Sequence, residues 1–132
     1  MSAVKAIRVL LLASPAVAAI VGDRVSAGDV PANALRPAIG VHEVSNVPVG
    51  AFDAQAESSL ATSRVQVTVH VKTYPEIAGL LRAARQACNF ERGLIAGVDV
   101  VSIVRDIVGP DLESESGHAK SIDFKVTYHE PN

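Results

Sequence analysis

Four histidines are the side chains of this sequence best suited to acid–base or metal chemistry: His42, His70, His118 and His129. Imidazole titrates near neutral pH and is the commonest metal ligand in proteins. None of the four stands at a metal-ligand spacing such as H-E-x-x-H. His42 and Glu43 are sequence neighbours, so on a strand their side chains point to opposite faces. The sequence therefore predicts no catalytic histidine, no metal site and no cofactor.

Three carboxylates, Asp111, Glu113 and Glu115, form the other cluster of chemically capable side chains. Carboxylate oxygens are calcium ligands, but an acidic hairpin tip is usually only solvated, so weak calcium binding stays the less favoured alternative. The glycines of residues 93–97 match neither G-x-G-x-x-G nor the Walker pattern. No motif predicts catalysis, and a small α+β enzyme is the disfavoured alternative. A deep pocket lined by His70 and a carboxylate would favour it.

The composition limits the classes of partner. The chain has 132 residues, which fits one domain over residues 1–132 with a real core. Twelve Lys and Arg against 14 Asp and Glu give a net charge of −2, and the only aromatic residues are three Phe and two Tyr. We therefore expect neither a cationic surface for duplex DNA nor a platform for base stacking. No apolar run approaches the ~20 residues of a membrane span. The lone Cys88 is interpreted as a buried hydrophobe in a reducing compartment.

The clearest patterns are a strand and a helix joined directly. From residue 65 to 71 every second residue is valine and the residues between are polar, which predicts a strand with one buried face. Thr73 and Glu76 stand as a capping box, with Pro75 in the first turn of the helix. Apolar residues then recur at three- and four-residue steps, as on one face of a helix. These residues are Ile77, Leu80, Leu81, Ala84 and Cys88.

Weaker patterns predict the other elements. Apolar residues within 3–12 predict a first helix, and Ser14 and Pro15 restart the chain as cap and first residue of a short second helix. A strand begins near Pro37, with a bulge or strand end near residues 42–43. The remaining segments follow in order: a loop over 25–36, a long loop over 45–62, a connector over 89–97, a strand over Val98–Val108 that is buried on both faces for part of its length, an acidic loop over 109–117, and a last strand whose residues Ile122, Phe124, Val126 and Tyr128 face inward.

The predicted order is helix, strand, strand, helix, strand, strand. We interpret this order as an α+β domain with a four-stranded sheet made of two hairpins, whose apolar face is covered by the helices. The core is predicted from the inward positions of the strand and helix patterns. Its members are Val67, Val69, Leu80, Leu81, Phe124 and Val126.

The long segment 45–62 is the strongest candidate for a functional surface. It has few apolar residues to pack on its own domain, and a loop of this length in a compact domain is usually functional or disordered. A solvated hairpin loop is the equal alternative for an isolated monomer. Together with the polar strand face and the acidic loop, this segment gives the predicted interface. The predicted interface residues are Val47, Val49, Phe52, Asp53, Glu57, Arg64, Gln66, His70, Asp111, Glu113 and Glu115.

Three stretches of the chain follow one another in an informative order: "LLLASPAVAAIVGDRV", "LRPAIGV" and "SRVQVTVHVKTYPEIAGLLRAARQA". From Val4 to Cys88 this order and spacing resembles the tail-completion, or tail-terminator, family of long-tailed, siphovirus-like bacteriophages. The closing "IDFKVTYHE" agrees with the plan of that family. Two departures occur. Family members often have an acidic residue at the Ser14-Pro15 position, and many have Leu-Pro directly where this chain inserts Arg36.

The resemblance implies a structural virion protein and no enzyme. It implies a ring, a hexamer, on the head-proximal end of the tail tube, which ends tube polymerisation and joins the tail to the neck. The implied partners are further copies of the chain, the tail tube protein and a neck or head–tail connector protein, with neither sequence-specific nucleic acid nor a membrane. The implied location is the virion tail, after synthesis in the host cytoplasm. Another neck or connector protein of the same virion is the alternative.

Overall fold

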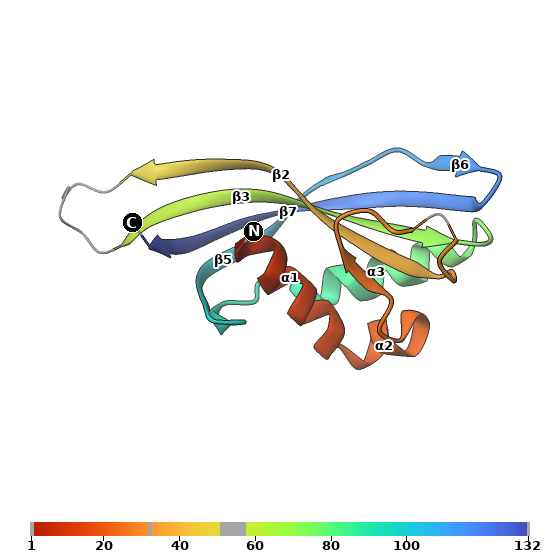
Figure 1. The fold of residues 1–132 in the computed structure, drawn as a ribbon, viewed down its shortest axis with the longest axis horizontal. Coiled ribbons are helices and arrows are strands. Elements are labelled where there is room, and N and C mark those ends of the chain that lie inside the picture. Colours follow the sequence, from red (N-terminus) through yellow and green to blue (C-terminus); the bar gives the residue numbers. More distant parts are fainter. Residues whose placement is uncertain (1, 32, 51–57, 132) are drawn as a thin grey trace.

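Three helices and seven strands make up the part of the chain that the computed structural model describes, residues 2–31, 33–50 and 58–131. All of these strands belong to one curled sheet, and the helices lie on one side of it (Figure 1). The elements are α1 (Ser2–Ala13), α2 (Pro15–Val21), β1 (Val25–Ala27), β2 (Ala38–Gly50), β3 (Ser58–Val71), α3 (Glu76–Cys88), β4 (Gly93–Ile95), β5 (Val98–Val108), β6 (Leu112–Ser114) and β7 (Gly117–Pro131).

The sheet has the strand order β1-β2-β3-β7-β5-β4, and β6 also pairs with β7. β1 runs parallel to β2, whereas the other pairs are antiparallel. The prediction of a four-stranded sheet made of two hairpins is therefore wrong. The four expected strands are present as β2, β3, β5 and β7. The additional strands β1, β4 and β6 have three residues each, too few to show a period of two, and they lie in segments expected as loops or connectors.

The long loop expected over residues 45–62 is mostly strand, because β2 and β3 extend into it from both sides. A bulge at Val44 explains why the strand pattern cannot be recognised in the sequence. It shifts the register between Glu43 and Ser45, so that the alternation of apolar and polar residues changes phase there. The part of the segment between the strands lies outside the described residues, and with it three predicted interface residues: Phe52, Asp53 and Glu57.

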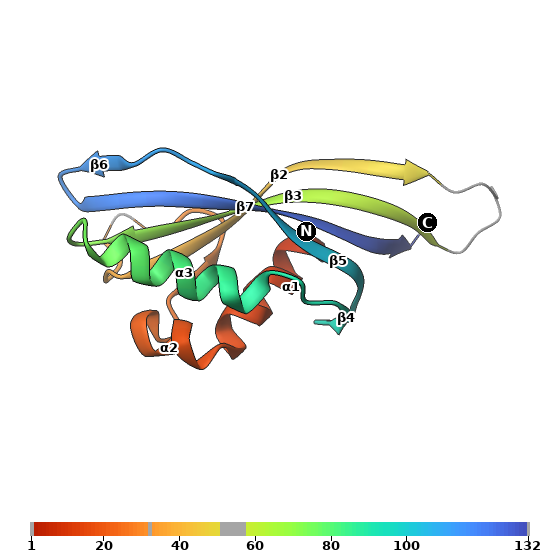
Figure 2. The ribbon, with the colours of Figure 1, turned by 180° about the vertical axis from the view of Figure 1, so that it is seen from behind.

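The core lies between the covered face of the sheet and helices α1 and α3, which contact each other below it (Figure 2). Five of the six predicted core residues are buried, and only Leu81 is partly exposed. The buried side of α3 includes Ala83 in place of Leu81, next to the predicted Ala84. The small alanine side chains let the helix pack close to its neighbours, so the wider Leu81 lies at the margin of the core.

Both expected helix starts are present, the second in a modified form. The Ser14 hydroxyl accepts a hydrogen bond from the Val17 N–H at 3.3 Å, as an N-cap does. At α3 the Thr73 N–H donates to the Glu76 carboxylate at 3.0 Å, which is one half of a capping box. The Thr73 hydroxyl donates to the same carboxylate, so the second half is missing, and Pro75 is the N-cap residue rather than part of the first turn.

Strand β5 is buried on one face only, which corrects the prediction of burial on both faces. A bulge between Val100 and Ser102 explains the mixed apolar pattern. Before the bulge Val100 faces the core, and after it Ile103 does, while Val101 and Val104 are exposed. The buried residues Val98 and Val100 before this bulge and Ile103 after it therefore lie on one face of β5, and a second register shift follows between Arg105 and Val108.

Among the described residues, no single helix has the length and apolar composition to cross a bilayer. The pair α1 and α2 reaches that length and composition together, but the two helices are bent by 84° at their junction. The inward side of α1, with Ala3, Ile7 and Leu11, is buried against the rest of the domain.

Candidate assembly surfaces

The hairpin of β2 and β3 extends beyond the helices as an arm (Figure 1). We define the arm by its described residues, 44–50 and 58–63. Three valines are exposed on it: Val44 at 52%, and Val47 and Val49 at 60% each. Apolar side chains that project from a strand into water are free to be covered by a partner, and covering them is favourable. Val47 and Val49 thus have the exposure that their predicted interface role requires.

The outer edge of the arm is unpaired among the described residues. β1 pairs with β2 only as far as Val41. The Ile39 N–H donates to the Arg24 carbonyl, so before the bulge the odd-numbered residues of β2 turn their backbone groups towards β1. Beyond the bulge the backbone N–H and C=O groups of the even-numbered residues point to that outer edge. Pro48 is one of these residues. The row of edge donors is therefore interrupted at Pro48, which has no N–H.

A polar network holds the base of the arm, where the helices no longer cover the sheet. The Asn46 side-chain amide donates to the Tyr128 hydroxyl at 2.8 Å and to the Ser63 hydroxyl at 2.9 Å. The Ser63 hydroxyl donates to the Glu43 carboxylate at 2.7 Å. This hydrogen bond, aided by one from Asn46, holds the pKa of Glu43 below its ordinary value. Because Ser63 and Tyr128 are buried, the network fixes the direction in which the arm leaves the domain.

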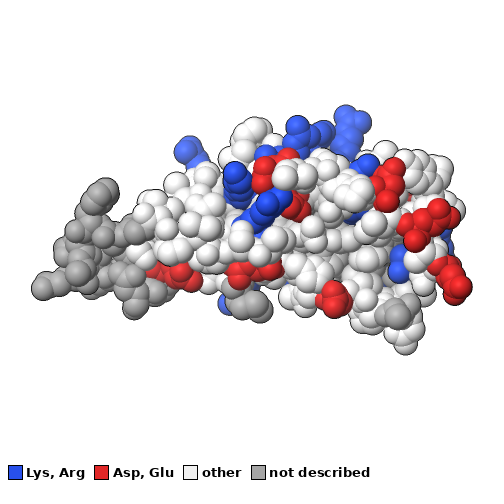
Figure 3. All heavy atoms as spheres, turned by 90° about the horizontal axis from the view of Figure 1, so that it is seen from above, with Lys and Arg blue, Asp and Glu red and all other residues white. Residues whose placement is uncertain are grey.

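Arg64 and Gln66, two predicted interface residues, lie on the uncovered face of the sheet. The Arg64 guanidinium donates to the Asp123 carboxylate at 2.8 Å, and its Nε lies 3.6 Å from a carboxylate oxygen of Asp106. Gln66 faces Asp123 across the β3–β7 pair and is half-buried. Seen from this side, positive side chains gather over the middle of the molecule with acidic ones among them, and further acidic side chains lie at the end that carries β6 (Figure 3). The carboxylates of Asp123 and Asp106 therefore balance the positive charge of Arg64 within the sheet.

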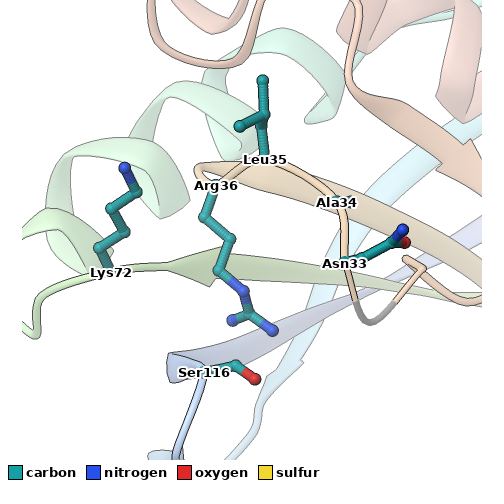
Figure 4. Close-up of a pocket in the computed structure, with 6 residues that line it drawn as sticks. All are labelled: Asn33, Ala34, Leu35, Arg36, Lys72 and Ser116. Atoms are coloured by element: carbon teal, nitrogen blue, oxygen red, sulfur yellow. The ribbon is translucent and has the colours of Figure 1, made fainter.

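His70, another predicted interface residue, is half-buried on the same face of β3. Loss of hydration lowers its pKa, and the positive charge of Arg36 lowers it further. An open hollow of about 240 Å³ lies close by, lined by residues 33–36, Lys72 and Ser116 (Figure 4). In Figure 4 the Arg36 guanidinium reaches towards Ser116. This hollow has neither His70 nor a carboxylate in its lining, so it lacks the pair on which the enzyme alternative depends.

His42 has a carboxylate partner that the sequence reasoning missed. Its Nε2 lies 2.8 Å from a carboxylate oxygen of Asp29, which comes from the segment between β1 and β2. Parallel pairing of β1 with β2 brings this segment next to His42, and a three-residue strand gives no sequence signal for that pairing. His42 and Glu43 both line a shallow hollow beside β1, but Glu43 is engaged in the network of the arm.

The acidic segment divides into one engaged carboxylate and two exposed ones. Asp111 accepts hydrogen bonds from Lys120 at 2.7 Å and from the Tyr74 hydroxyl at 2.9 Å. The bond from Lys120, followed by that from Tyr74, lowers the pKa of Asp111. Glu113 on β6 and Glu115 in the turn that follows it are exposed. Across the described ranges, no group of three or more His, Cys, Asp or Glu side chains could hold a metal ion, so the geometry gives no support to a calcium site.

Comparison with known proteins agrees with this arrangement. No curated protein matches the chain. A chain in the solved structure described as "Virion of native gene transfer agent (GTA) particle" is similar in fold, with a TM-score of 0.65. It is 15% identical, and the match covers 94% of this chain and 92% of that one. The family described as "Tail completion protein gp17" matches residues 5–126, which is nearly the whole chain. The protein therefore belongs to the tail completion protein gp17 family.

Proposed function

We propose that the protein forms a hexameric ring on the head-proximal end of a phage tail tube, where it ends tube polymerisation and joins the tail to the neck. Its family makes it a structural protein of a phage-like tail. The observation that carries the finer proposal is the arm, which projects beyond the core with Val44, Val47 and Val49 exposed. A domain that acts alone has no need of such a projection, whereas a subunit that must contact a neighbour does.

The shape of the molecule supports a ring. Copies that are related by rotation contact one another head to tail, so each needs two different surfaces at separate places. The arm lies at one end of the long axis, and β6 with the start of α3 lies at the other (Figure 1). The ring closes when the rotation from one copy to the next divides a full turn.

The charge of the molecule is compatible with a passage for DNA. The net charge is −2, and Arg64 on the uncovered sheet face is paired with Asp123. A molecule with a net negative charge attracts the phosphate backbone only weakly, which suits a passage for DNA. The proposed partners are therefore further copies of the chain, the tail tube protein and a neck protein, and the proposed location is the head-proximal end of the virion tail.

The experiment is complementation of a phage whose own tail completion gene is deleted. Intact protein should restore tails of uniform length and infectious particles, as seen by electron microscopy and plaque counts. A variant without residues 48–57 should keep its circular dichroism spectrum but fail to attach to tubes, because the deletion removes residues 48–50 of the arm together with the segment that follows them. Normal tail joining by this deletion variant would contradict the proposal.

Binding to separated virion parts distinguishes the proposal from its alternative. A protein that ends tube growth should bind purified tubes in the absence of heads, and tubes without it should grow beyond their normal length. Another neck or connector protein should bind heads and leave tube length unchanged. The second result would assign this chain to the neck.

A further inference from the structure

An exposed aromatic ring lies just after α3, on a backbone conformation that its size disfavours. Phe90 is 77% exposed and has a φ of 68°, in the left-handed region that bulky residues rarely adopt. Two hydrogen bonds with β5 hold this position. The Phe90 N–H donates to the Ile103 carbonyl at 2.9 Å, and the Arg105 N–H donates to the Asn89 side-chain oxygen at 3.0 Å. A strained residue whose ring stays in water is a candidate for a contact with another molecule.

Positive charge is in excess beside this ring. We define the basic patch by four residues of α3, the connector and β5: Arg85, Phe90, Arg92 and Arg105. Arg105 lies on the helix side of the sheet, because it faces the core residue Phe124 across the β5–β7 pair. Among the described residues the three arginines form no ion pair. Glu91 is the only carboxylate between residues 82 and 92. The patch therefore fits a partner that has an apolar side chain beside negative charge.

A surface with this chemistry lies near the other end of α3. We define the acidic tip as Leu112 and Glu113 on β6 and Glu115 in the turn that follows. Leu112 is 54% exposed. Neither glutamate forms an ion pair with another described residue, and Figure 3 shows acidic side chains at this end of the molecule. The tip and the patch thus have the same plan with opposite charge.

The two surfaces are too far apart to meet within one molecule. The Tyr74 hydroxyl, just before α3, donates to Asp111 at 2.9 Å, so the acidic tip lies beside the start of this helix. The basic patch lies at its end, and a helix of 13 residues is about 20 Å long. Figure 2 shows β6 near the start of α3 and β4, which follows Arg92, beyond the other end. Head-to-tail contacts between copies need two separate, complementary surfaces of this kind.

We propose that the acidic tip of one copy binds the basic patch of a second copy. Leu112 packs on the ring of Phe90, and the two glutamates face the arginines beside it. An apolar centre sets the contact area, while the charges around it set the orientation of the two copies. Both surfaces belong to this chain, so the partner that offers the matching charge is a second copy. The proposal rests on the ring proposed above and names its subunit contact.

Photo-cross-linking between labelled and unlabelled copies tests the contact. Benzoylphenylalanine replaces Leu112 in one variant and Val9, which is exposed on α1, in the control variant. Rings that contain ¹⁵N-labelled and unlabelled copies are assembled on tail tubes, irradiated and analysed by mass spectrometry. Position 112 should give mixed-isotope cross-links to residues 85–92 or 105. Position 9 should give no mixed-isotope cross-link to these residues.

The outcomes separate the contact from the ring. If rings form but position 112 cross-links to another part of a copy or to the tube protein, the proposed contact is wrong and the ring stands. If the unaltered protein forms no ring on tubes, the function proposed above fails and the contact fails with it.

Exchange of the charges gives an independent readout. Glu113→Arg together with Glu115→Arg should raise the protein concentration needed for ring assembly by roughly tenfold, because the tip then repels the patch. Adding Arg92→Glu and Arg105→Glu to this variant should restore assembly, since the two surfaces match again with their charges exchanged. Sedimentation measures assembly, and circular dichroism confirms that each variant is folded.

The matched control keeps the net charge but not the pairing. It combines the reversed tip with Lys5→Glu and Lys125→Glu, at two exposed positions outside both surfaces, and has the same net charge as the fourfold exchange. This control should assemble as poorly as the variant with the reversed tip alone. Equal assembly of the exchange variant and the control would overturn the proposal.

Discussion

Arg64 on β3 and Asp123 on β7 form a diagonal ion pair on the uncovered side of the sheet, with Nε and Oδ2 2.8 Å apart. Asp123 is only 5% exposed although its face carries no helix. A carboxylate this deeply buried must be paired, since an isolated charge there would be strongly destabilising. The pair therefore joins the two central strands, β3 and β7, by side chains as well as by the backbone ladder.

We expect Asp123→Ala to lower the free energy of unfolding by about 1.5–3 kcal/mol, the usual value of a hydrogen bond to a charged group. The loss stays within this range because Asp106 remains 3.6 Å from the Arg64 guanidinium. Urea denaturation measures it. The control Lys125→Ala, at an exposed position on the same face, should change stability by less than about 0.5 kcal/mol. Equal losses from both variants would mean that the pair contributes little.

The two neighbouring leucines of α3 should differ in their contributions. Leu80 is fully buried, so Leu80→Ala should cost about 2–5 kcal/mol. Leu81 lies at the margin of the core and lines an open hollow next to Val108 of β5, so Leu81→Ala should cost clearly less. Thermal and urea unfolding of the two variants give the comparison. A larger loss from Leu81→Ala would show that the buried face of the helix is the other one.

The hydrogen bonds of the Glu43 carboxylate at the base of the arm should make the stability of the protein depend on pH in the acid range. Its pKa is lowered in the folded protein, so its contribution to stability is present above the unfolded pKa and is lost as pH falls through the folded pKa. Ser63→Ala should bring the pKa of Glu43 closer to its ordinary value of 4.5 and flatten this acid dependence. Carbon-detected NMR titration of the carboxylate measures the pKa. An unchanged pKa would remove the Ser63 hydroxyl as its cause.

Replacement of all four histidines by Gln should leave phage complementation nearly intact. Gln keeps hydrogen-bonding capacity, so the contact between His42 and Asp29 has a substitute donor. An enzyme that used one of them for acid–base catalysis would instead lose about 10²–10⁴-fold in rate. A folded, ring-forming variant that fails to complement would point to a histidine-dependent function.

The long elements were predictable because their patterns extend over several periods. The alternating valines of β3 and the apolar stripe of α3 each repeat often enough to fix the buried face. Bulges at Val44 and Val101 each change the phase of a strand, and a single change makes alternation look like a loop or like burial on both faces. The three-residue strands have no period at all.

The candidate surfaces were likewise predictable from the sequence only in part. Val47 and Val49 were identified because they are among the few apolar residues of a segment that has little to pack on its own domain, and both are exposed. The Asn46–Tyr128 hydrogen bond joins residues 82 positions apart, and the hollow lined by Leu81 and Val108 depends on how α3 meets the distant strand β5. Such contacts are set by the sheet order, which the sequence did not reveal.

Pro48 lets the arm stay exposed for binding while it prevents further chains from adding along the bare strand edge. A subunit made before its place in an assembly is available must remain soluble, yet a long bare strand edge is a template on which further chains grow into fibres. With Pro48 on that edge, a chain that added there would lose a backbone bond in mid-strand. Pro48 thereby limits stacking through the backbone, while Val44, Val47 and Val49 remain exposed for a contact through their side chains.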